Sequence, residues 1–211
     1  MIELKNVTKQ FSSQKVVFRD VNKKFKPGEF VGLIGPNGSG KTTFLRILSV
    51  NSFPSSGSVY FDGLNIHNKS SQYLQHVGLV HDEESLPLHL SAVELLVWVL
   101  RSRNKWDSNS EKKIDQIFNR LELMDDRHSA IGTYSTGMRK KTQIAAAFIT
   151  DPEVLILDEP MRGLDTDSRD TITGMLTEAK QRNAMILMAS HLMNRDNQDV
   201  DRILDFPLAA E

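Results

Sequence analysis

The chain has 211 residues, of which 39% are hydrophobic and 25% charged, and its 26 basic residues nearly balance 27 acidic ones. A formal net charge of −1 argues against a general nucleic-acid or membrane-surface binder, because such proteins usually carry a basic excess. The absence of cysteine excludes thiol nucleophiles, disulfides and thiolate zinc sites. No stretch approaches the roughly 18 apolar residues of a membrane-spanning helix, so we expect one soluble domain, with or without an inserted lobe, and no direct membrane insertion.

Four segments in the first third of the chain carry signals of secondary structure. Residues 2–7 alternate apolar and polar side chains, as a half-buried strand does, and residues 57–62 show a second, hairpin-like alternation. A turn signal precedes the apolar run of residues 30–34, which we expect to form a strand, and the pattern of residues 42–50 predicts a helix.

The middle of the chain is predicted to be helical, and two buried strands follow it. Helical periodicity extends over residues 90–100 and 112–123, and the alanine-rich residues 136–149 predict a third helix. Residues 154–157 and 185–188 are continuous apolar runs, typical of strands buried on both faces. Strands separated by helices favour an α/β fold with a parallel sheet, and the helical middle would be inserted between the two halves of that sheet.

The strongest single signal is a glycine-rich segment that fits the phosphate-binding pattern G-x-x-x-x-G-K-[ST]. It consists of Gly35, Pro36, Asn37, Gly38, Ser39, Gly40, Lys41 and Thr42, and Thr43 follows. Glycines let consecutive backbone N–H groups turn toward an anion, and the helix that follows points its positive end at the same place. Lys41 adds a full charge for the β- and γ-phosphates, and the Thr42 hydroxyl can ligate Mg²⁺. The flanking strand and helix disfavour a plain glycine turn.

Two adjacent acids follow the buried run at residues 154–157. A strand in this position delivers Asp158 and Glu159 to the carboxyl edge of the sheet, where ligands bind in open α/β folds. We expect Asp158 to hold Mg²⁺, directly or through water, and Glu159 to polarise an attacking water as general base. The alternative is a strand with an acidic turn, which the phosphate-binding segment in the same chain disfavours.

Residues 104–107 match N-K-x-D, the guanine-reading pattern of GTPases. Those enzymes also need D-x-x-G to sense the γ-phosphate, and no aspartate of this chain has glycine three residues later. The run before residue 104 also fits an amphipathic helix better than a strand. We therefore interpret residues 104–107 as a polar loop.

Residues 134–141 carry the most specific resemblance to a known family. With this segment in place between the phosphate-binding loop and the acid pair, the chain resembles the ATP-binding subunit of an ABC transporter. Ser135, Thr136 and Gly137 resemble the family's signature loop, usually L-S-G-G-Q, in a form similar to that of bacterial exporters of drugs, peptides and polysaccharides. In the family this helix N-terminus binds the γ-phosphate of ATP held by the other subunit, a role that suits a serine cap at a free helix end. Alone, the segment would favour an ordinary capped helix.

Four further positions follow the family pattern or depart from it. Phe11 lies where the family places an aromatic ring that stacks on adenine, with core packing as the alternative. Asp165 resembles the loop that lies across the dimer interface, and His191 resembles the switch histidine that contacts the γ-phosphate. Asp82 departs from the pattern, because most relatives have a glutamine there that touches Mg²⁺ and the attacking water. A carboxylate still ligates Mg²⁺, but it adds negative charge near the γ-phosphate and donates no hydrogen bond when ionised.

The resemblance implies a single ABC-type ATP-binding domain over residues 1–211. Its P-loop NTPase core would span about 1–84 and 150–211, with a mixed, largely parallel sheet and an N-terminal antiparallel part, and its inserted helical lobe would span about 85–149. The cofactors implied are ATP and Mg²⁺. The catalytic residues implied are Glu159, His191 and Lys41, and the metal ligands are Thr42, Asp82 and Asp158.

The resemblance also implies partners. Two copies, or this chain and a similar one, would bind two ATP molecules between them and power a separate transmembrane permease, with export as the implied direction. The dimer would act at the cytoplasmic face of the membrane, and no nucleic acid would take part. Two alternatives stay open. A ribosome-binding or DNA-repair ATPase is disfavoured by the length and neutral charge of the chain, and an adaptor that binds ATP without hydrolysis is opposed by Glu159 and His191 but not by Asp82.

Overall fold

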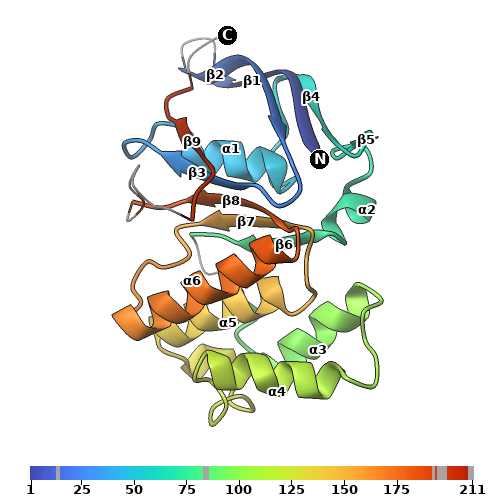
Figure 1. Ribbon diagram of the computed structural model, residues 1–211, viewed down its shortest axis with the longest axis vertical. Coiled ribbons are helices and arrows are strands. Elements are labelled where there is room, and N and C mark those ends of the chain that lie inside the picture. The colour runs from blue at the N-terminus through green and yellow to red at the C-terminus, as the bar shows by residue number, and fades with distance from the viewer. Residues whose placement is uncertain (13–14, 83–85, 192, 194–198, 209–211) are drawn as a thin grey trace.

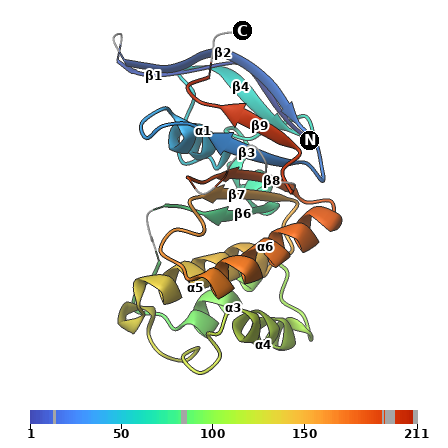
Figure 2. The same cartoon turned by 60° about the vertical axis from the view of Figure 1, so that its left-hand side comes forward.

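The chain folds into two β-sheets of different kinds, which lie one above the other with a helix between them (Figure 1). The structure, a computed structural model, describes residues 1–208 apart from 13–14, 83–85, 192 and 194–198. Further helices cover the free face of the second sheet, as the turned view in Figure 2 also shows. The molecule is therefore layered, from the antiparallel sheet through the central helix and the parallel sheet to the helical layer.

The antiparallel sheet is built from the first part of the chain. Its strands are β1 (Ile2–Ser12), β2 (Lys15–Phe25), β4 (Ser56–Phe61) and β5 (Leu64–Asn65), in the order β2-β1-β4-β5. β1 and β2 form a long hairpin in which Ser12 pairs with Lys15 and Gln10 with Val16. This register brings Lys15 next to the end of β1.

The parallel sheet has the order β6-β7-β8-β3-β9. Its strands are β3 (Phe30–Ile34), β6 (Val77–Val80), β7 (Val154–Asp158), β8 (Met185–Ala189) and β9 (Arg202–Asp205). Every residue of β7 and β8 is buried, because these strands have neighbours on both sides and packed layers on both faces. All five strands run in the same direction, so their carboxyl ends meet at one edge of the sheet.

The helices are α1 (Lys41–Leu48), α2 (Ser70–Leu74), α3 (Ala92–Ser102), α4 (Ser110–Arg120), α5 (Thr136–Phe148) and α6 (Thr166–Gln181), with one 3-10 turn at Ile131–Thr133. α3 begins with a reciprocal cap, because Ser91 Oγ accepts from the Glu94 N–H while the Glu94 carboxylate accepts from the Ser91 N–H. Among the residues that the structure describes, every helix is too short or too polar to cross a bilayer.

Two hydrophobic clusters fill the spaces on either side of the parallel sheet. The first joins α1 to both sheets, and the Phe44 ring of α1 makes edge-on contacts with the rings of Phe18, Phe25 and Phe206, at centroid distances of 5.8, 6.3 and 5.5 Å. The second joins α3, α4, α5 and α6 to the opposite face of the sheet. The first cluster fixes the start of α1 beside the edge where the strands end.

The α/β prediction is confirmed, including its N-terminal antiparallel part. The antiparallel strands form a sheet of their own, because β1 pairs with antiparallel neighbours and α1 separates its sheet from the parallel one. Residues 104–107 form a loop between α3 and α4, in which Asp107 accepts hydrogen bonds from the Asn109 N–H and the Ser110 hydroxyl. This agrees with the interpretation of residues 104–107 as a polar loop.

Candidate active site

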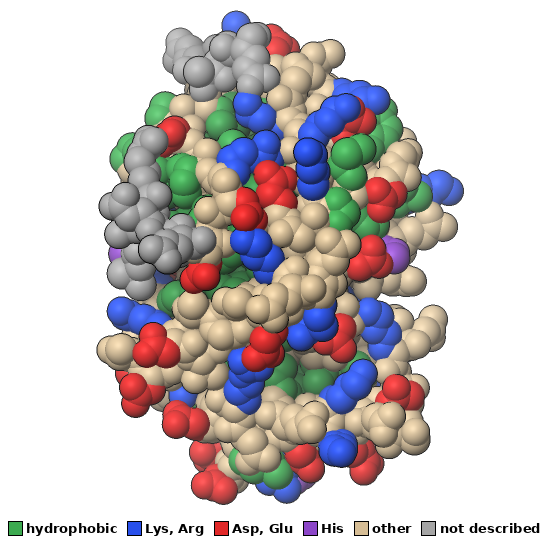
Figure 3. All heavy atoms as spheres, viewed as in Figure 1, with side chains coloured by type: hydrophobic (Ala, Val, Ile, Leu, Met, Phe, Trp, Pro, Cys, Tyr) green, Lys and Arg blue, Asp and Glu red, His purple; other side chains and the backbone are tan. Residues whose placement is uncertain are grey.

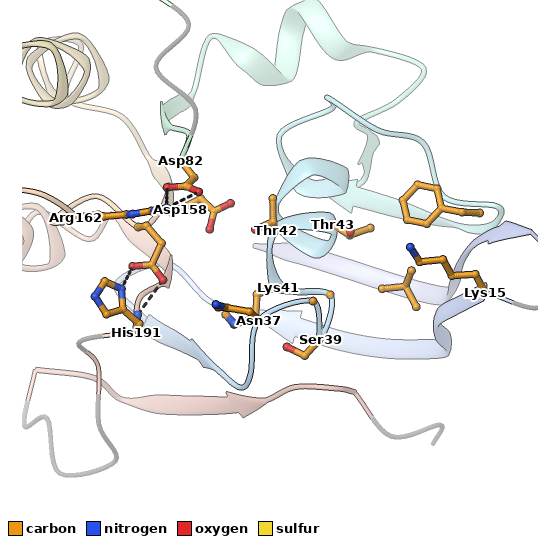
Figure 4. Close-up of a pocket in the computed structure, with 15 residues that line it drawn as sticks. Lys15, Asn37, Ser39, Lys41, Thr42, Thr43, Asp82, Asp158, Arg162 and His191 are labelled. Carbon is orange, nitrogen blue, oxygen red and sulfur yellow. Dashed lines mark hydrogen bonds and ion pairs between the residues drawn. The ribbon is translucent and has the colours of Figure 1, made fainter. Parts of the chain in front are cut away.

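A cavity of about 720 Å³ opens where the parallel strands end and α1 begins. Figure 4 shows the side chains around it, which come from five separate parts of the chain. Of the residues predicted from the sequence, those that line it are Phe11, Asn37, Gly38, Ser39, Gly40, Lys41, Thr42, Thr43, Asp82, Asp158, Glu159 and His191. The fold therefore brings the phosphate-binding segment, the acid pair and the histidine to one place.

The loop between β3 and α1 is shaped for an anion. Gly40 has a φ of 108°, and a Cβ there would lie 2.6 Å from Val17 Cγ1, so both the backbone and the space require glycine. Ser39 Oγ is buried and finds no hydrogen-bond partner in the described part of the chain. A buried hydroxyl without a partner is costly, and a phosphate oxygen in the loop would satisfy it. The residues present therefore fit a phosphate.

Lys41 lies over this loop. Its Nζ donates to the carbonyl oxygens of Gly35, at 2.7 Å, and Pro36, at 3.1 Å. Gly35 and Pro36 do not line the cavity, and they contribute through these two carbonyl groups. The ammonium group is thus held at the mouth of the loop by weak acceptors, which phosphate oxygens would replace with stronger ones.

Asp158 and Thr42 supply oxygen atoms beside the loop. Asp158 is only 5% exposed, and burial raises the pKa of its carboxyl group. The hydrogen bond from Thr42 acts to lower this pKa, while the charges of Asp82 and Glu159 raise it further. A buried acid among other acids gains from a bound cation, and hydroxyl and carboxylate oxygens suit Mg²⁺. Within the described ranges, no group of three or more histidine or acidic side chains is arranged to hold a metal ion. The coordination shell of a Mg²⁺ ion at Asp158 and Thr42 would therefore need further oxygen atoms from the ligand.

Glu159 and His191 are joined directly. The backbone N–H of His191 donates to Glu159 Oε1 at 2.9 Å, and His191 Nδ1 lies 2.7 Å from Glu159 Oε2. The Glu159 N–H donates to the carbonyl of Ala189, the last residue of β8, which ties the loop after β7 to the neighbouring strand. Both oxygens of the carboxylate are therefore oriented by one residue that comes from a different strand.

Phe11 also lines the cavity. Its side chain is exposed, which excludes the core-packing alternative, and Lys9 Nζ and Lys15 Nζ lie 5.1 and 5.9 Å from the ring centroid. Exposed aromatic faces of this kind bind other flat rings by stacking. The assignment of Phe11 to adenine stays a prediction.

The signature-like residues and Asp165 lie elsewhere. Ser135 caps α5, with its Oγ accepting from the Met138 N–H at 3.2 Å. Asp165 caps α6 by accepting from the N–H and the hydroxyl of Ser168, and these hydrogen bonds hold the pKa of Asp165 below its usual value. Ser135, Thr136, Gly137 and Asp165 are absent from the cavity lining. Their predicted contact with a nucleotide would have to be made on another copy, and it stays a prediction.

Three residues of the cavity wall were missed by sequence reasoning: Lys15, Val17 and Arg162. Lys15 and Val17 lie on β2, a strand whose bounds were not predicted, and its pairing with β1 places them near Phe11. Arg162 lies in the turn after β7 and forms an ion pair with Asp82, at 3.1 Å. The two residues are far apart in the chain, so no local pattern could have indicated this pair.

Comparisons with known proteins match nearly the whole chain. A family model described as ABC transporter matches residues 18–162. The ABC transporter ATP-binding protein NatA of Bacillus subtilis is 31% identical over 97% of this chain and 85% of its own length. The Nod factor export ATP-binding protein I of Cupriavidus pinatubonensis is 31% identical, and the spermidine/putrescine import ATP-binding protein PotA of Spiroplasma citri is 35% identical. This chain spans only 62% and 58% of these last two proteins.

A solved structure extends the comparison to the fold. The dimeric structure of MJ0796, a bacterial ABC transporter cassette, superimposes with a TM-score of 0.85 at 26% identity, over 98% of this chain and 94% of that one. The same cassette is known as a dimer in a post-hydrolysis state bound to ADP and Pi.

Proposed function

This chain belongs to the ABC transporter family, as one of its ATP-binding subunits, and we propose that it hydrolyses Mg²⁺-bound ATP in the described cavity to drive a separate membrane-spanning subunit. One observation carries the catalytic part of the proposal. The phosphate-binding loop with Lys41 and the Glu159–His191 pair line the same cavity, so a phosphate held by the first would lie within reach of the second.

We assign each side chain of the cavity a separate role in phosphoryl transfer to water. Lys41 would exchange its carbonyl partners for phosphate oxygens and neutralise their charge, together with the backbone N–H groups of the loop. Glu159 would accept a proton from the attacking water, and His191 would hold the carboxylate in position. Thr42 and Asp158 would hold Mg²⁺, which would withdraw charge from the phosphate oxygens. The carboxylate of Asp82, which the family pattern implies as a third ligand, is paired with Arg162.

Dimer formation completes the proposal. Ser135, Thr136, Gly137 and Asp165 lie outside the chain's own cavity, and we infer that they serve the cavity of a second copy or a similar chain. The dimeric cassette MJ0796 supports this arrangement by its fold. A helix N-terminus such as that of α5 is a favourable place for a phosphate from the partner.

The partner in transport would be a separate permease, contacted through the helical lobe at about residues 85–149 and the segment around Asp82. This chain would then work at the cytoplasmic face of the membrane. Export is the direction that the signature form supports, while similar proteins are named for import as well as for export.

Phosphate release by the purified chain tests the proposal. We expect Mg²⁺-dependent hydrolysis of ATP that depends on Glu159 and Lys41, and co-purification with a multi-span membrane protein when both are expressed together. Absence of ATP binding would overturn the catalytic proposal, and a chain that pulls down ribosomes instead of a membrane protein would overturn the transport proposal.

A further inference from the structure

Asp82 and Arg162 form an ion pair in the wall of the cavity, and Figure 4 shows the two side chains pointing toward each other beside Asp158. Nη1 of Arg162 lies 3.1 Å from Oδ1 and 3.2 Å from Oδ2 of Asp82. Asp82 follows β6 and Arg162 follows β7, and these strands are neighbours in the parallel sheet. The pair therefore bridges two loops at the edge where the proposed phosphates would lie.

The backbone at Asp82 is fixed separately from its carboxylate. Lys140 of α5 is 3% exposed, and its Nζ donates to the carbonyl oxygens of His81, at 3.0 Å, and Asp82, at 3.4 Å. A buried ammonium group that donates to backbone carbonyls holds them firmly, because leaving either side unpaired in the interior is costly. Lys140 therefore fixes the backbone from which the side chain of Asp82 projects.

The charge of Asp82 faces a site that already holds acids. Asp82, Asp158 and Glu159 all line the cavity, and its proposed ligand is a polyphosphate. Like charges that line the same cavity repel, all the more where protein lowers the local dielectric constant. Without a nearby cation, Asp82 would therefore weaken the binding of the nucleotide.

We propose that Arg162 is a positioning residue for the nucleotide, which neutralises the carboxylate of Asp82 and holds it aside from the phosphate site. The proposal rests on the proposed function, since it requires that the cavity bind ATP. It explains how a carboxylate is tolerated at a position where a neutral side chain would be the simpler solution. The charges of Asp82 and Arg162 cancel each other. Removal of Arg162 alone should therefore weaken ATP binding, and removal of both charges should largely restore it.

Four proteins test this proposal: the wild type, Arg162→Ala, Asp82→Gln and the double variant, each titrated with ATP in EDTA at low and at high salt. We expect Arg162→Ala to weaken ATP binding about fivefold, which corresponds to the upper range for exposed charges. Asp82→Gln should bind as tightly as the wild type or more tightly, and the double variant should return to within about twofold of the wild type. The loss in Arg162→Ala should shrink at high salt, because salt screens exposed charges.

Two controls separate charge from structure. Arg162→Lys should restore most of the affinity, since it keeps the charge but not the geometry of the guanidinium. Arg182 and Asp151 form a comparable exposed pair outside the cavity, at 3.6 Å, and Arg182→Ala should leave ATP binding unchanged. Equal thermal midpoints for the variants would show that folding is not the cause of a difference.

Two results would overturn the proposal. If the double variant binds ATP as weakly as Arg162→Ala, Arg162 acts on the nucleotide independently of Asp82. If Arg162→Ala binds ATP with wild-type affinity, the ion pair has no effect on nucleotide binding. Failure of the proposed function has a different signature, because then the wild type itself would not bind ATP, or Lys41→Ala would bind it equally well.

Discussion

His191 holds both oxygens of the Glu159 carboxylate, one through its backbone N–H at 2.9 Å and the other through Nδ1 of its ring at 2.7 Å. A carboxylate only accepts hydrogen bonds when ionised, so the proton of this contact belongs to Nδ1. A neutral ring in this tautomer has no proton at Nε2. To donate to a phosphate oxygen, as the family pattern implies, His191 must therefore carry a second proton or release Glu159.

Replacement of His191 by Ala is expected to lower kcat about 100-fold with a small effect on the affinity for ATP. The variant keeps the backbone N–H at Glu159 Oε1 but loses the ring that orients Oε2, and a general base contributes typically 10²–10⁴-fold. Steady-state phosphate release and ATP titration measure the two quantities. Because the two residues act as a unit, combining His191→Ala with Glu159→Gln should cost little more than Glu159→Gln alone. Multiplicative losses would show that the residues act independently.

Lys41→Ala is expected to weaken ATP binding at least about tenfold and to remove hydrolysis, because the cavity loses the charge that faces the phosphates. Lys41→Arg should not restore activity, since a planar guanidinium cannot occupy the place of a compact ammonium group between the carbonyls of Gly35 and Pro36. Lys112→Ala, at an exposed position of α4, is the matched control. Wild-type affinity in Lys41→Ala would contradict the assignment of the loop.

The sequence predicted most of what depends on local patterns. The strands at residues 30–34, 154–157 and 185–188, the helix after the phosphate-binding loop and the three middle helices are confirmed within a few residues of their ends. Short strands were expected over the first 35 residues, but the bounds of β2 were not predicted, because its sequence, with five charged residues in K-V-V-F-R-D-V-N-K-K-F, lacks a clean alternation. About half of its positions face solvent. α6 was missed because polar residues fill most of its first turns.

The site was predictable where function fixes residue type and spacing, as at Lys41, Asp158 and Glu159. It was not predictable where function depends on tertiary contacts. The contact of Arg162 with Asp82 and that of Lys140 with the carbonyl of His81 join segments that are distant in the chain. Charge alone does not distinguish a solvated side chain from one that lies in a cavity wall or in the interior. Side chains of both signs are interspersed over the face shown in Figure 3, so a surface charge pattern would not have singled them out either.

Asp158→Asn is expected to stabilise the nucleotide-free protein while it removes hydrolysis. Burial raises the pKa of Asp158, so the folded chain binds this proton more tightly than the unfolded chain does. The stability is then highest while the carboxyl is protonated, and it falls as pH rises from the unfolded value of 3.8 through the higher folded pKa. At neutral pH the amide should raise the thermal midpoint, by about 2–4 °C for each kcal/mol gained in a chain of this size. A lower midpoint for Asp158→Asn would contradict this electrostatic account.

The ion pair between Arg120 and Glu178 is expected to stabilise the contact of α4 with α6. Its two hydrogen bonds measure 2.6 and 2.8 Å, and the hydrogen bond from Arg120 holds the pKa of Glu178 below its usual value. Both side chains are partly exposed, so the coupling should stay below about 1 kcal/mol. The contribution is complete above pH 4.5 and is lost as pH falls through the folded pKa. A double-mutant cycle with Arg120→Met and Glu178→Gln measures it, and a coupling that persists at pH 2 would contradict the ionic origin.

The central claim is that Glu159 is the general base of an ATPase that closes as a dimer, and Glu159→Gln tests it most directly. The amide keeps an oxygen for the His191 N–H but cannot take a proton from water. We predict that turnover falls by about 10²–10⁴-fold, that ATP binding is retained, and that light scattering finds a long-lived dimer only with ATP. Unchanged phosphate release by Glu159→Gln would contradict the account.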